Sequence, residues 1–374
     1  MKRAWPAPFN ITVPSTNPTD GTVQVPAYNS KMSRYFGLHP QLLSYDAATS
    51  FGMNVGWNSK GYADQFANFN ETVKYRWYAG TIARSNGILS YTPTEFGSVG
   101  LLPSDPMFQH PNGVFGQMII EPAGSKFQCG DPGALGSCEG GSTVSRTSAT
   151  VTLSTGGRYR EFSIMLSDAL ITSAAQPINA INYSTEPANH RFAKSGTDVS
   201  CMTSNTLADP TQSTPVQIGE PQTPIFKANP GDQVRFRMTH PLGTGNSEVF
   251  TIHGHGWQKN PYQNNSTIIA PNNLSQWIGS RDNHGSTDHF DILIPSAGGT
   301  GKRPGDYLYT TYLPADASAG SWGIFRVATN FNLPTPTGVC TPGAATEAAP
   351  ASRGPIQNLI DRFRRPPLNP SSKP

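Results

Sequence analysis

The chain has 374 residues, with 27 Lys and Arg against 24 Asp and Glu, and a formal net charge of +3. This near-neutral balance gives no general case for a nucleic-acid partner or for binding at a membrane surface, and the apolar runs are far too short to span a bilayer. Only 14% of the residues are charged, while 37 glycines and 34 prolines leave few helix formers. We therefore expect an all-β, loop-rich globular protein rather than a helical bundle or a disordered chain.

Strand signals, taken in chain order, fall into two blocks. The first block has an alternating strand at residues 72–79, a loop around residues 103–113 and an apolar strand at residues 114–120. The second block opens at residues 147–169 with two strands around Gly156 and Gly157. It continues with predicted strands at residues 233–238, 249–253, 289–294, 305–312 and 322–327.

The two blocks repeat one unit. Each ends in a loop, a glycine-bearing turn and a hydrophobic strand, and many short strands joined by Gly/Pro turns are typical of Greek-key β-sandwiches. We therefore predict two tandem β-sandwich domains, at residues 1–140 and 141–335. Residues 336–374 are rich in proline and alanine and are predicted to be a tail that wraps another surface or stays disordered.

Four cysteines allow two disulfides. Cys129 and Cys138 bracket a Gly/Pro-rich loop and could close a local bridge, and Cys201 and Cys340 could form a second one; neither pairing follows from the sequence alone. Because disulfides persist in oxidising compartments, we expect an extracellular or periplasmic protein. The N-terminus has a basic start but no apolar h-region, so either a signal was removed and replaced or the chain is cut from a longer precursor.

The segment FTIHGHGW at residues 250–257 carries the clearest chemical signal. In a strand, His253 and His255 would point to the same face, because side chains alternate with period two. Neutral imidazole is a common ligand of copper and zinc, and the flanking glycines allow close approach. The pattern therefore predicts a metal site at His253 and His255, although two histidines at a strand end without a metal would look the same.

Residues 230–238 (PGDQVRFRM), the IHGHGW string and the segment around GDYLY at residues 305–309 resemble a cupredoxin domain of the multicopper oxidases. The first block, with YRWYAG and EFGSVGLLPSDPMFQHPNGVFGQMIIEPAG, is similar to a domain of the large six-domain, ceruloplasmin-like bacterial oxidases. The resemblance covers most of residues 50–330. It implies two tandem cupredoxin-like Greek-key β-sandwich domains that form the C-terminal part, or a subunit, of such an oxidase.

The resemblance also implies a function. The family's His-X-His motif contributes to a trinuclear copper cluster between two domains, so His253 and His255 would be copper ligands. The site would be completed by further cupredoxin domains or chains of the same oxidase. Such an enzyme couples the oxidation of a substrate to the reduction of dioxygen.

The chain departs from the family where the other copper ligands belong. After GDYLY the family has either His-X-His or a His-Cys-His motif with a later His and Met, whereas this chain has Thr310, Thr311 and Tyr312, then Asp316 and Ser321. A blue-copper centre needs a thiolate and two imidazoles, so we expect none here, and no turnover by the isolated chain. The alternative is a copper-free cupredoxin pair that serves as a structural or interaction module of an extracellular assembly.

A third hypothesis is a mononuclear copper or zinc site made by His253, His255 and a ligand from residues 281–291. His240 is expected at the surface, at a strand end. His284 and His289 flank a polar loop with Asp288 and Asp291, for which a solvated loop is the more common explanation. The remaining histidines have no partners at ligand spacing: His39, His110 and His190.

Overall fold

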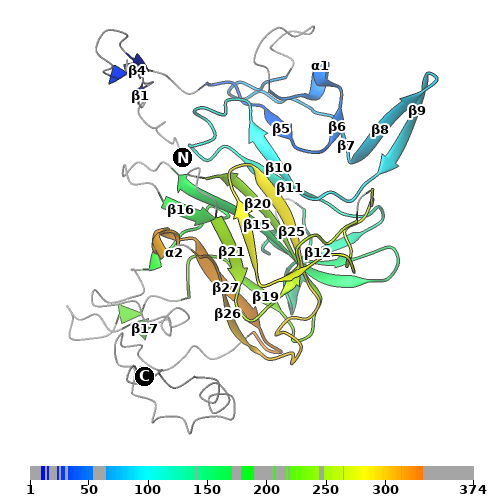
Figure 1. Cartoon of the computed structure of the whole chain (residues 1–374), viewed down its shortest axis with the longest axis vertical. Coiled ribbons are helices and arrows are strands. Elements are labelled where there is room, and N and C mark those ends of the chain that lie inside the picture. The colour runs from blue at the N-terminus through cyan, green and yellow to red at the C-terminus, as the bar shows by residue number, and fades with distance from the viewer. Residues whose placement is uncertain are drawn as a thin grey trace, which may run out of the picture.

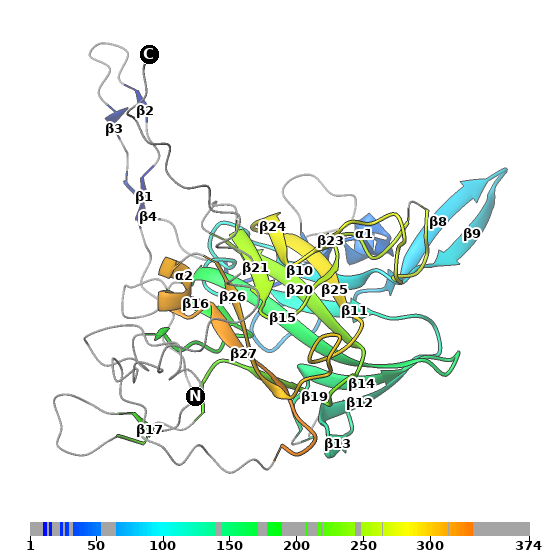
Figure 2. The same ribbon diagram turned by 60° about the horizontal axis from the view of Figure 1, so that its bottom comes forward.

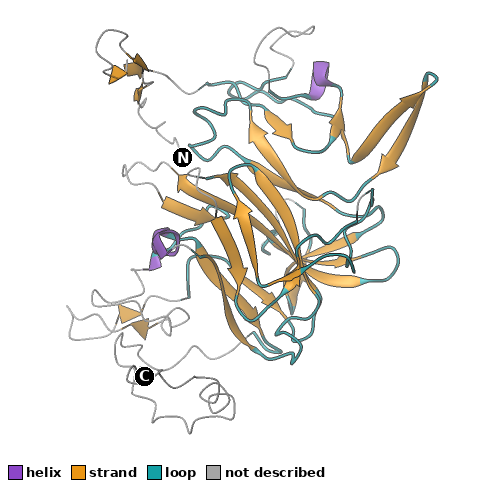
Figure 3. Cartoon of the chain, in the orientation of Figure 1, coloured by secondary structure: helices purple, strands orange, loops and turns teal. Residues whose placement is uncertain are grey.

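The computed structural model describes residues 33–53, 65–139, 142, 144–170, 178–188, 220–243, 248–263, 265–312 and 314–331, and short strands at 10–12, 15–16, 23–24, 27–29, 206–207 and 216–217. This part of the chain is nearly all β (Figure 3), with two short helices, α1 (Ala47–Ser50) and α2 (Pro314–Ala319). The predicted all-β class is confirmed. No helix among the described residues is long and apolar enough to cross a membrane.

Two large sheets form a sandwich (Figure 1). The seven-stranded sheet has the order β13–β12–β14–β15–β20–β25, and β16 pairs with β15; its strands are β12 (Lys126–Asp131), β13 (Ala134–Gly136), β14 (Ser148–Thr152), β15 (Arg158–Leu170), β16 (Ile178–Ile181), β20 (Val234–Leu242) and β25 (Asp288–Ile294). The five-stranded sheet has the order β19–β27–β26–β21–β24; its strands are β19 (Ile225–Ala228), β21 (Glu248–Ile252), β24 (Ser280–His284), β26 (Gly305–Thr311) and β27 (Trp322–Val327).

The core lies between these two sheets, and the period-two alternation of the strands produces it. In β20, Val234, Phe236 and Met238 point inward, and in β15 Phe162, Ile164 and Leu166 do the same. Their partners from the five-stranded sheet and the loops next to it include Phe226, Phe250, Ile252, Trp257, Tyr309 and Phe325. The five strands predicted between residues 233 and 327 are therefore all present. Each one has a row of buried apolar side chains and is rich in residues that favour strands.

A third layer covers the outer face of the seven-stranded sheet. It is a three-stranded sheet of β5 (Leu38–Pro40), β10 (Gly97–Pro103) and β11 (Gly116–Ile120), in the order β11–β10–β5. Strand β10 packs against β20 and β25, and the sheet lies above the sandwich in Figure 1. The described part of the first block thus contributes one small sheet that uses the second block's sheet as its packing partner.

The remaining strands form two-stranded ladders. The largest is the hairpin of β8 (Gly80–Ser85) and β9 (Ile88–Pro93), which projects away from the body of the molecule in Figures 1 and 2. The strand predicted at residues 72–79 is shorter than expected, because only Trp77 and Tyr78 pair, as β7. The other ladders are β1 (Asn10–Thr12) with β4 (Ala27–Asn29), β2 (Ser15–Thr16) with β3 (Val23–Gln24), β6 (Ser44–Tyr45) with β7 (Trp77–Tyr78), β17 (Thr206–Leu207) with β18 (Val216–Gln217), and β22 (Trp257–Gln258) with β23 (Trp277–Ile278).

Buried charges fill the space between the three-stranded sheet and the seven-stranded sheet. Arg237 is fully buried and is hydrogen bonded to four carboxylates: to Glu161 at 2.9 Å, Asp291 at 3.0 Å, Glu95 at 3.3 Å and Glu121. A second arginine, Arg235, joins Glu95 at 2.5 Å. Because Glu95 and Glu121 flank the three-stranded sheet whereas both arginines come from β20, these contacts tie the two layers together. We call these six residues the interlayer ion network.

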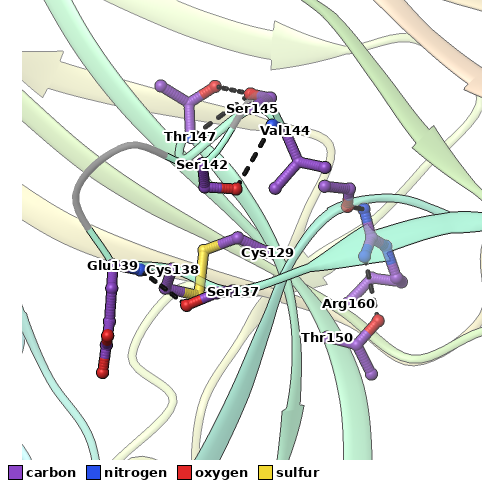
Figure 4. Close-up of a disulfide and its surroundings, with 11 residues drawn as sticks. Cys129, Ser137, Cys138, Glu139, Ser142, Val144, Ser145, Thr147, Thr150 and Arg160 are labelled. Carbon is purple, nitrogen blue, oxygen red and sulfur yellow. Dashed lines mark hydrogen bonds between the residues drawn. A yellow bond between two sulfur atoms is a disulfide. The ribbon is translucent and has the colours of Figure 1, made fainter.

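The disulfide predicted between Cys129 and Cys138 is present, with the two Cα atoms 5.0 Å apart (Figure 4). It joins β12 to the end of the loop after β13. The second predicted pair, Cys201 and Cys340, lies outside the described residues.

The large sheet begins before the predicted domain boundary. Strands β12 and β13 end before residue 140, yet β12 pairs with β14 over four residue pairs. Strands β12 and β13 are therefore hydrogen bonded into the large sheet that the second block forms. The division into residues 1–140 and 141–335 stays a prediction, and the tail at residues 336–374 lies outside the described residues.

Candidate metal centre

The two histidines of the HGHGW segment lie beyond the end of a strand. Strand β21 ends at Ile252, and the chain then turns at Gly254, whose φ of 72° is a conformation that favours glycine. Strand alternation therefore stops before His253, and the expectation that both side chains share a strand face is wrong. His253 is exposed, whereas His255 is buried.

Both ring nitrogens of His255 have partners within the chain. Its Nδ1 lies 3.0 Å from the carbonyl oxygen of His253, and its Nε2 accepts a hydrogen bond from the Gly298 N–H at 3.0 Å. The ring also packs against Tyr307 and Phe325, and burial lowers the pKa of His255. This arrangement describes a neutral ring with Nδ1–H as the donor. The assignment of copper to His253 and His255 stays a prediction, since the structure gives the two imidazoles different surroundings.

A different group of titratable side chains converges where β15, β20 and β24 end and β21 begins. These residues, which we call the His–carboxylate cluster, are Asp168, His240, Glu248 and His284, each about 1% exposed. The expectations that His240 lies at the surface and that His284 belongs to a solvated loop are therefore wrong. One ligand atom from each of His240, Glu248 and His284 lies within 4.8 Å of the other two.

The strand pattern explains how the sequence builds this cluster. The inward rows of β15 and β20 each contain three apolar residues and then, two residues further on, Asp168 and His240. The inward row of β21 starts with Glu248, and in the next strand His284 is the direct cross-strand partner of Glu248. Each core row thus ends in a polar residue at the same end of the sandwich.

The His240 ring contacts a second imidazole on one side and carboxylates on the other. The Nδ1 atoms of His240 and His284 lie 3.1 Å apart, a separation that suits two imidazoles on one ion, because metal–nitrogen distances are about 2.0–2.1 Å for zinc. On the far side of the ring, His240 Nε2 lies 3.1 Å from Asp168 Oδ2 and 3.7 Å from Glu248 Oε1. A carboxylate in this position orients an imidazole and raises its basicity as a ligand.

Several atoms of the cluster have no hydrogen-bond partner among the described residues, although they are buried: Asp168 Oδ1, Glu248 Oε2 and His284 Nε2. Buried polar atoms are normally paired, and leaving one unpaired costs about 1–3 kcal/mol. Two of these atoms, Glu248 Oε2 and His284 Nε2, belong to side chains that could be ligands, so the cluster is a candidate site for a bound ion.

The protonation states also favour metal binding. Burial, with an electrostatic effect of the neighbouring His240 ring, lowers the pKa of His284 to about 3, so the His284 ring is neutral at pH 7. Burial raises the pKa of Glu248 to about 10, an effect reinforced by its hydrogen bond with Asp168 and by the charges of Asp168 and Asp316. Burial opposes ionisation of Asp168 as well, but its hydrogen bonds with His240 and Glu248 lower its pKa overall. The site therefore presents one carboxylate and one neutral acid that a cation would deprotonate.

The cluster lies beside positions where the family resemblance places sulfur and imidazole ligands. Burial raises the pKa of Asp316, and the charge of Asp168 reinforces this effect. The Asp316 Oδ2 accepts a 3.5 Å hydrogen bond from the Thr311 hydroxyl. The Thr311 N–H in turn donates to the carbonyl of Ser321. The donor set among these described residues is nitrogen and oxygen without a thiolate, which fits Zn²⁺, Cu²⁺ or Fe²⁺ and not a blue-copper centre.

The other residues considered in the sequence are placed elsewhere. Asp291 belongs to the interlayer ion network, and His289 is half-buried beside it. His39 lies 3.2 Å from the Phe51 carbonyl oxygen, and His110 is buried. His190 lies outside the described residues. None of the described ones among these residues joins the His–carboxylate cluster as it is defined above.

No family model matches the chain, and no curated protein matches it. Among solved structures, it is similar to a multicopper oxidase, at 13% sequence identity over 79% of this chain and 71% of that chain, with a TM-score of 0.40. It is also similar to a copper nitrite reductase from Nitrosomonas europaea, at 11% identity over 80% and 76% of the two chains, with a TM-score of 0.40. A laccase from Botrytis aclada has 14% identity over 67% and 38%, with a TM-score of 0.36.

Proposed function

We propose that the chain is a cupredoxin-like metal-binding protein that holds one divalent transition-metal ion, Cu²⁺ or Zn²⁺, at His240, Glu248 and His284. The observation that carries the proposal is the convergence of these three buried side chains, two of which keep an atom, Glu248 Oε2 and His284 Nε2, that has no hydrogen-bond partner among the described residues. His240 and His284 would supply neutral imidazoles and Glu248 a carboxylate, while Asp168 would hold the ring of His240 in place.

The ion bound at such a site would supply Lewis acidity or, if it is copper, one-electron chemistry. The chain's own residues would exclude bulk water, because all four side chains of the cluster are buried between the two sheets. Metal binding would also release a proton, because Glu248 is protonated at neutral pH and has to lose that proton to become a ligand.

The experiment is metal analysis of the intact chain. After loading with Cu²⁺ or Zn²⁺ and desalting, we expect about one ion per chain by mass spectrometry, and its loss in His240→Ala and in His284→Ala. His253→Ala is the matched control, because it removes an imidazole outside the cluster, and it should retain the ion. No retained metal in the folded wild type, or retention in His284→Ala, would overturn the proposal.

The same variants test the second candidate function. We also propose, from the family resemblance, that the exposed His253 together with His255 contributes to a copper site completed by another cupredoxin domain or chain of an extracellular or periplasmic oxidase. The exposure of His253 supports this, since a shared ligand has to reach the surface. Metal lost in His253→Ala and kept in His284→Ala would favour it. A folded chain that binds no metal, alone or with a partner, would instead be a structural or interaction module.

A further inference from the structure

A polar cavity of about 440 Å³ lies beside the disulfide, away from the His–carboxylate cluster. On one side it is lined by Gly133 and Leu135 from the disulfide-closed loop, and on the other by residues of the turn between β19 and β20, among them Asp232. Arg158 and Arg160 of β15 also line it. Figure 4 shows Arg160 and its partner Thr150 close to the bridge between Cys129 and Cys138. We call this space the arginine cavity.

Arg160 is a buried cation whose protein partners are all uncharged. Its side chain donates to the Gly130 carbonyl at 2.9 Å, to the Thr150 hydroxyl at 2.9 Å and to the Lys227 carbonyl at 3.2 Å. These bonds use three of the five N–H groups of a guanidinium. No carboxylate among the described residues forms an ion pair with it, in contrast to the four that surround Arg237. Burial lowers the pKa of Arg160 to about 10, although the charges of Asp131 and Asp232 act to raise it.

The nearest charges leave the cavity positive. Arg158 is exposed at its edge. Asp131 is engaged by Lys227 at 2.9 Å, and Asp232 accepts a hydrogen bond from the Asn229 N–H at 2.8 Å within its own turn. Counting these five side chains, three cations face two carboxylates, so one positive charge is uncompensated. A buried charge normally has a partner of opposite sign.

We propose that the arginine cavity binds a small oxyanion group, a phosphate or sulfate, with Arg160 at its base and Arg158 at its mouth. A guanidinium with free N–H groups matches the oxygen geometry of such groups and forms charge-assisted hydrogen bonds with them. The volume exceeds that of a bare tetrahedral oxyanion, so the group can be carried by a small organic ester. This site is independent of the metal proposal, because no residue is shared between them.

The test is calorimetric titration of the full chain with inorganic phosphate and with glucose 6-phosphate, and with glucose as the neutral control. We expect saturable binding of the two phosphates and none of glucose. Tighter binding of the sugar phosphate would identify an ester as the ligand, and equal binding a free oxyanion; both outcomes support an oxyanion site.

Two variants separate this site from general surface charge. Arg158→Gln should weaken phosphate binding about tenfold, whereas Arg84→Gln, the same charge change on the exposed strand β8, should leave it unchanged. Asp232→Asn keeps the oxygen that accepts from Asn229 but removes a negative charge, so it should tighten binding several-fold. The proposal is overturned if phosphate does not bind saturably, or if Arg84→Gln weakens binding as much as Arg158→Gln.

Discussion

Glu161 is the residue on which the interlayer ion network depends for its charge balance. Four carboxylates share two arginines there, so full ionisation would leave two negative charges in a buried space. Burial, with a hydrogen bond to Glu121, raises the pKa of Glu161 to about 8, whereas the pKa of Glu121 is lowered. At neutral pH Glu161 is therefore the protonated member, which donates to Glu121 and accepts from Arg237.

Glu161→Gln should change how stability depends on pH. An unfolded glutamate loses its proton near 4.5, while folded Glu161 keeps it up to about pH 8, so this group stabilises the fold most at low pH and the benefit is lost as pH rises from 4.5 to 8. Glutamine copies the protonated form, with one donor and one acceptor. We expect urea unfolding to give similar stability for variant and wild type at pH 5, and a variant roughly 1–3 kcal/mol more stable at pH 8.5. Parallel pH profiles for the two proteins would contradict this role of Glu161.

At the scale of the element, β10 attaches the third layer, and its first residue determines how closely it can approach. Gly97 has a φ of 63°, and the Ser98 N–H that follows donates to Asp291 Oδ1 at 3.2 Å. A Cβ atom on Gly97 would lie 2.2 Å from Asp291 Oδ2. Strand β10 therefore reaches β25 only because its first residue is glycine.

Gly97→Ala should destabilise the protein by about 2–4 kcal/mol, because it combines an unfavourable backbone conformation with displacement of a buried carboxylate. Gly87→Ala is the matched control: Gly87 in the β8–β9 turn has a φ of 81°, but nothing lies within 4 Å of a Cβ there. It should cost about 1 kcal/mol. Equal losses in the two variants, measured by urea unfolding, would show that close approach to Asp291 does not matter.

The sequence predicted the strands well and the candidate metal centre poorly, for one physical reason. Hydrophobic alternation and turn-forming residues are local features of the sequence. Strands β20 and β25 to β27 could therefore be predicted from the residues of each strand alone. Asp168 and His284 are 116 positions apart, and only the register of four strands brings them together. A usable signal was present, because the apolar rows of β15 and β20 each continue into a polar residue. The HGHGW pattern predicts a metal site at His253 and His255 instead, and the turn at Gly254 could not be predicted from spacing alone.

For the whole molecule, the question is whether the three-stranded sheet is a separate folding unit. Its described strands have no second sheet of their own to pack on, and its charged contacts end on β15, β20 and β25. Removing it would expose Arg237 and take away two of its four carboxylate partners, Glu95 and Glu121, which is strongly destabilising. The layer and the sandwich should therefore unfold together.

Native-state hydrogen exchange of the intact chain tests this. Amides of β10 and β20 should exchange with the same, highest free energy of opening, because both need global unfolding. The β8–β9 hairpin projects from the body with mostly exposed residues and serves as the internal control, with fast exchange. A clearly lower opening free energy for β10 than for β20 would support two independent domains with a boundary near residue 140.

The bridge between Cys129 and Cys138 also has a consequence for solubility. The seven-stranded sheet ends at β13, a strand of only three residues that covers the outer edge of β12. The bridge holds that short strand in place, and Phe127 of β12 is already 44% exposed. In a reducing environment β13 can separate and leave the backbone groups of β12 open to strand addition by another copy. Self-association at this edge would then precede loss of the fold, so the oxidised bridge protects the protein from aggregation as well as from unfolding.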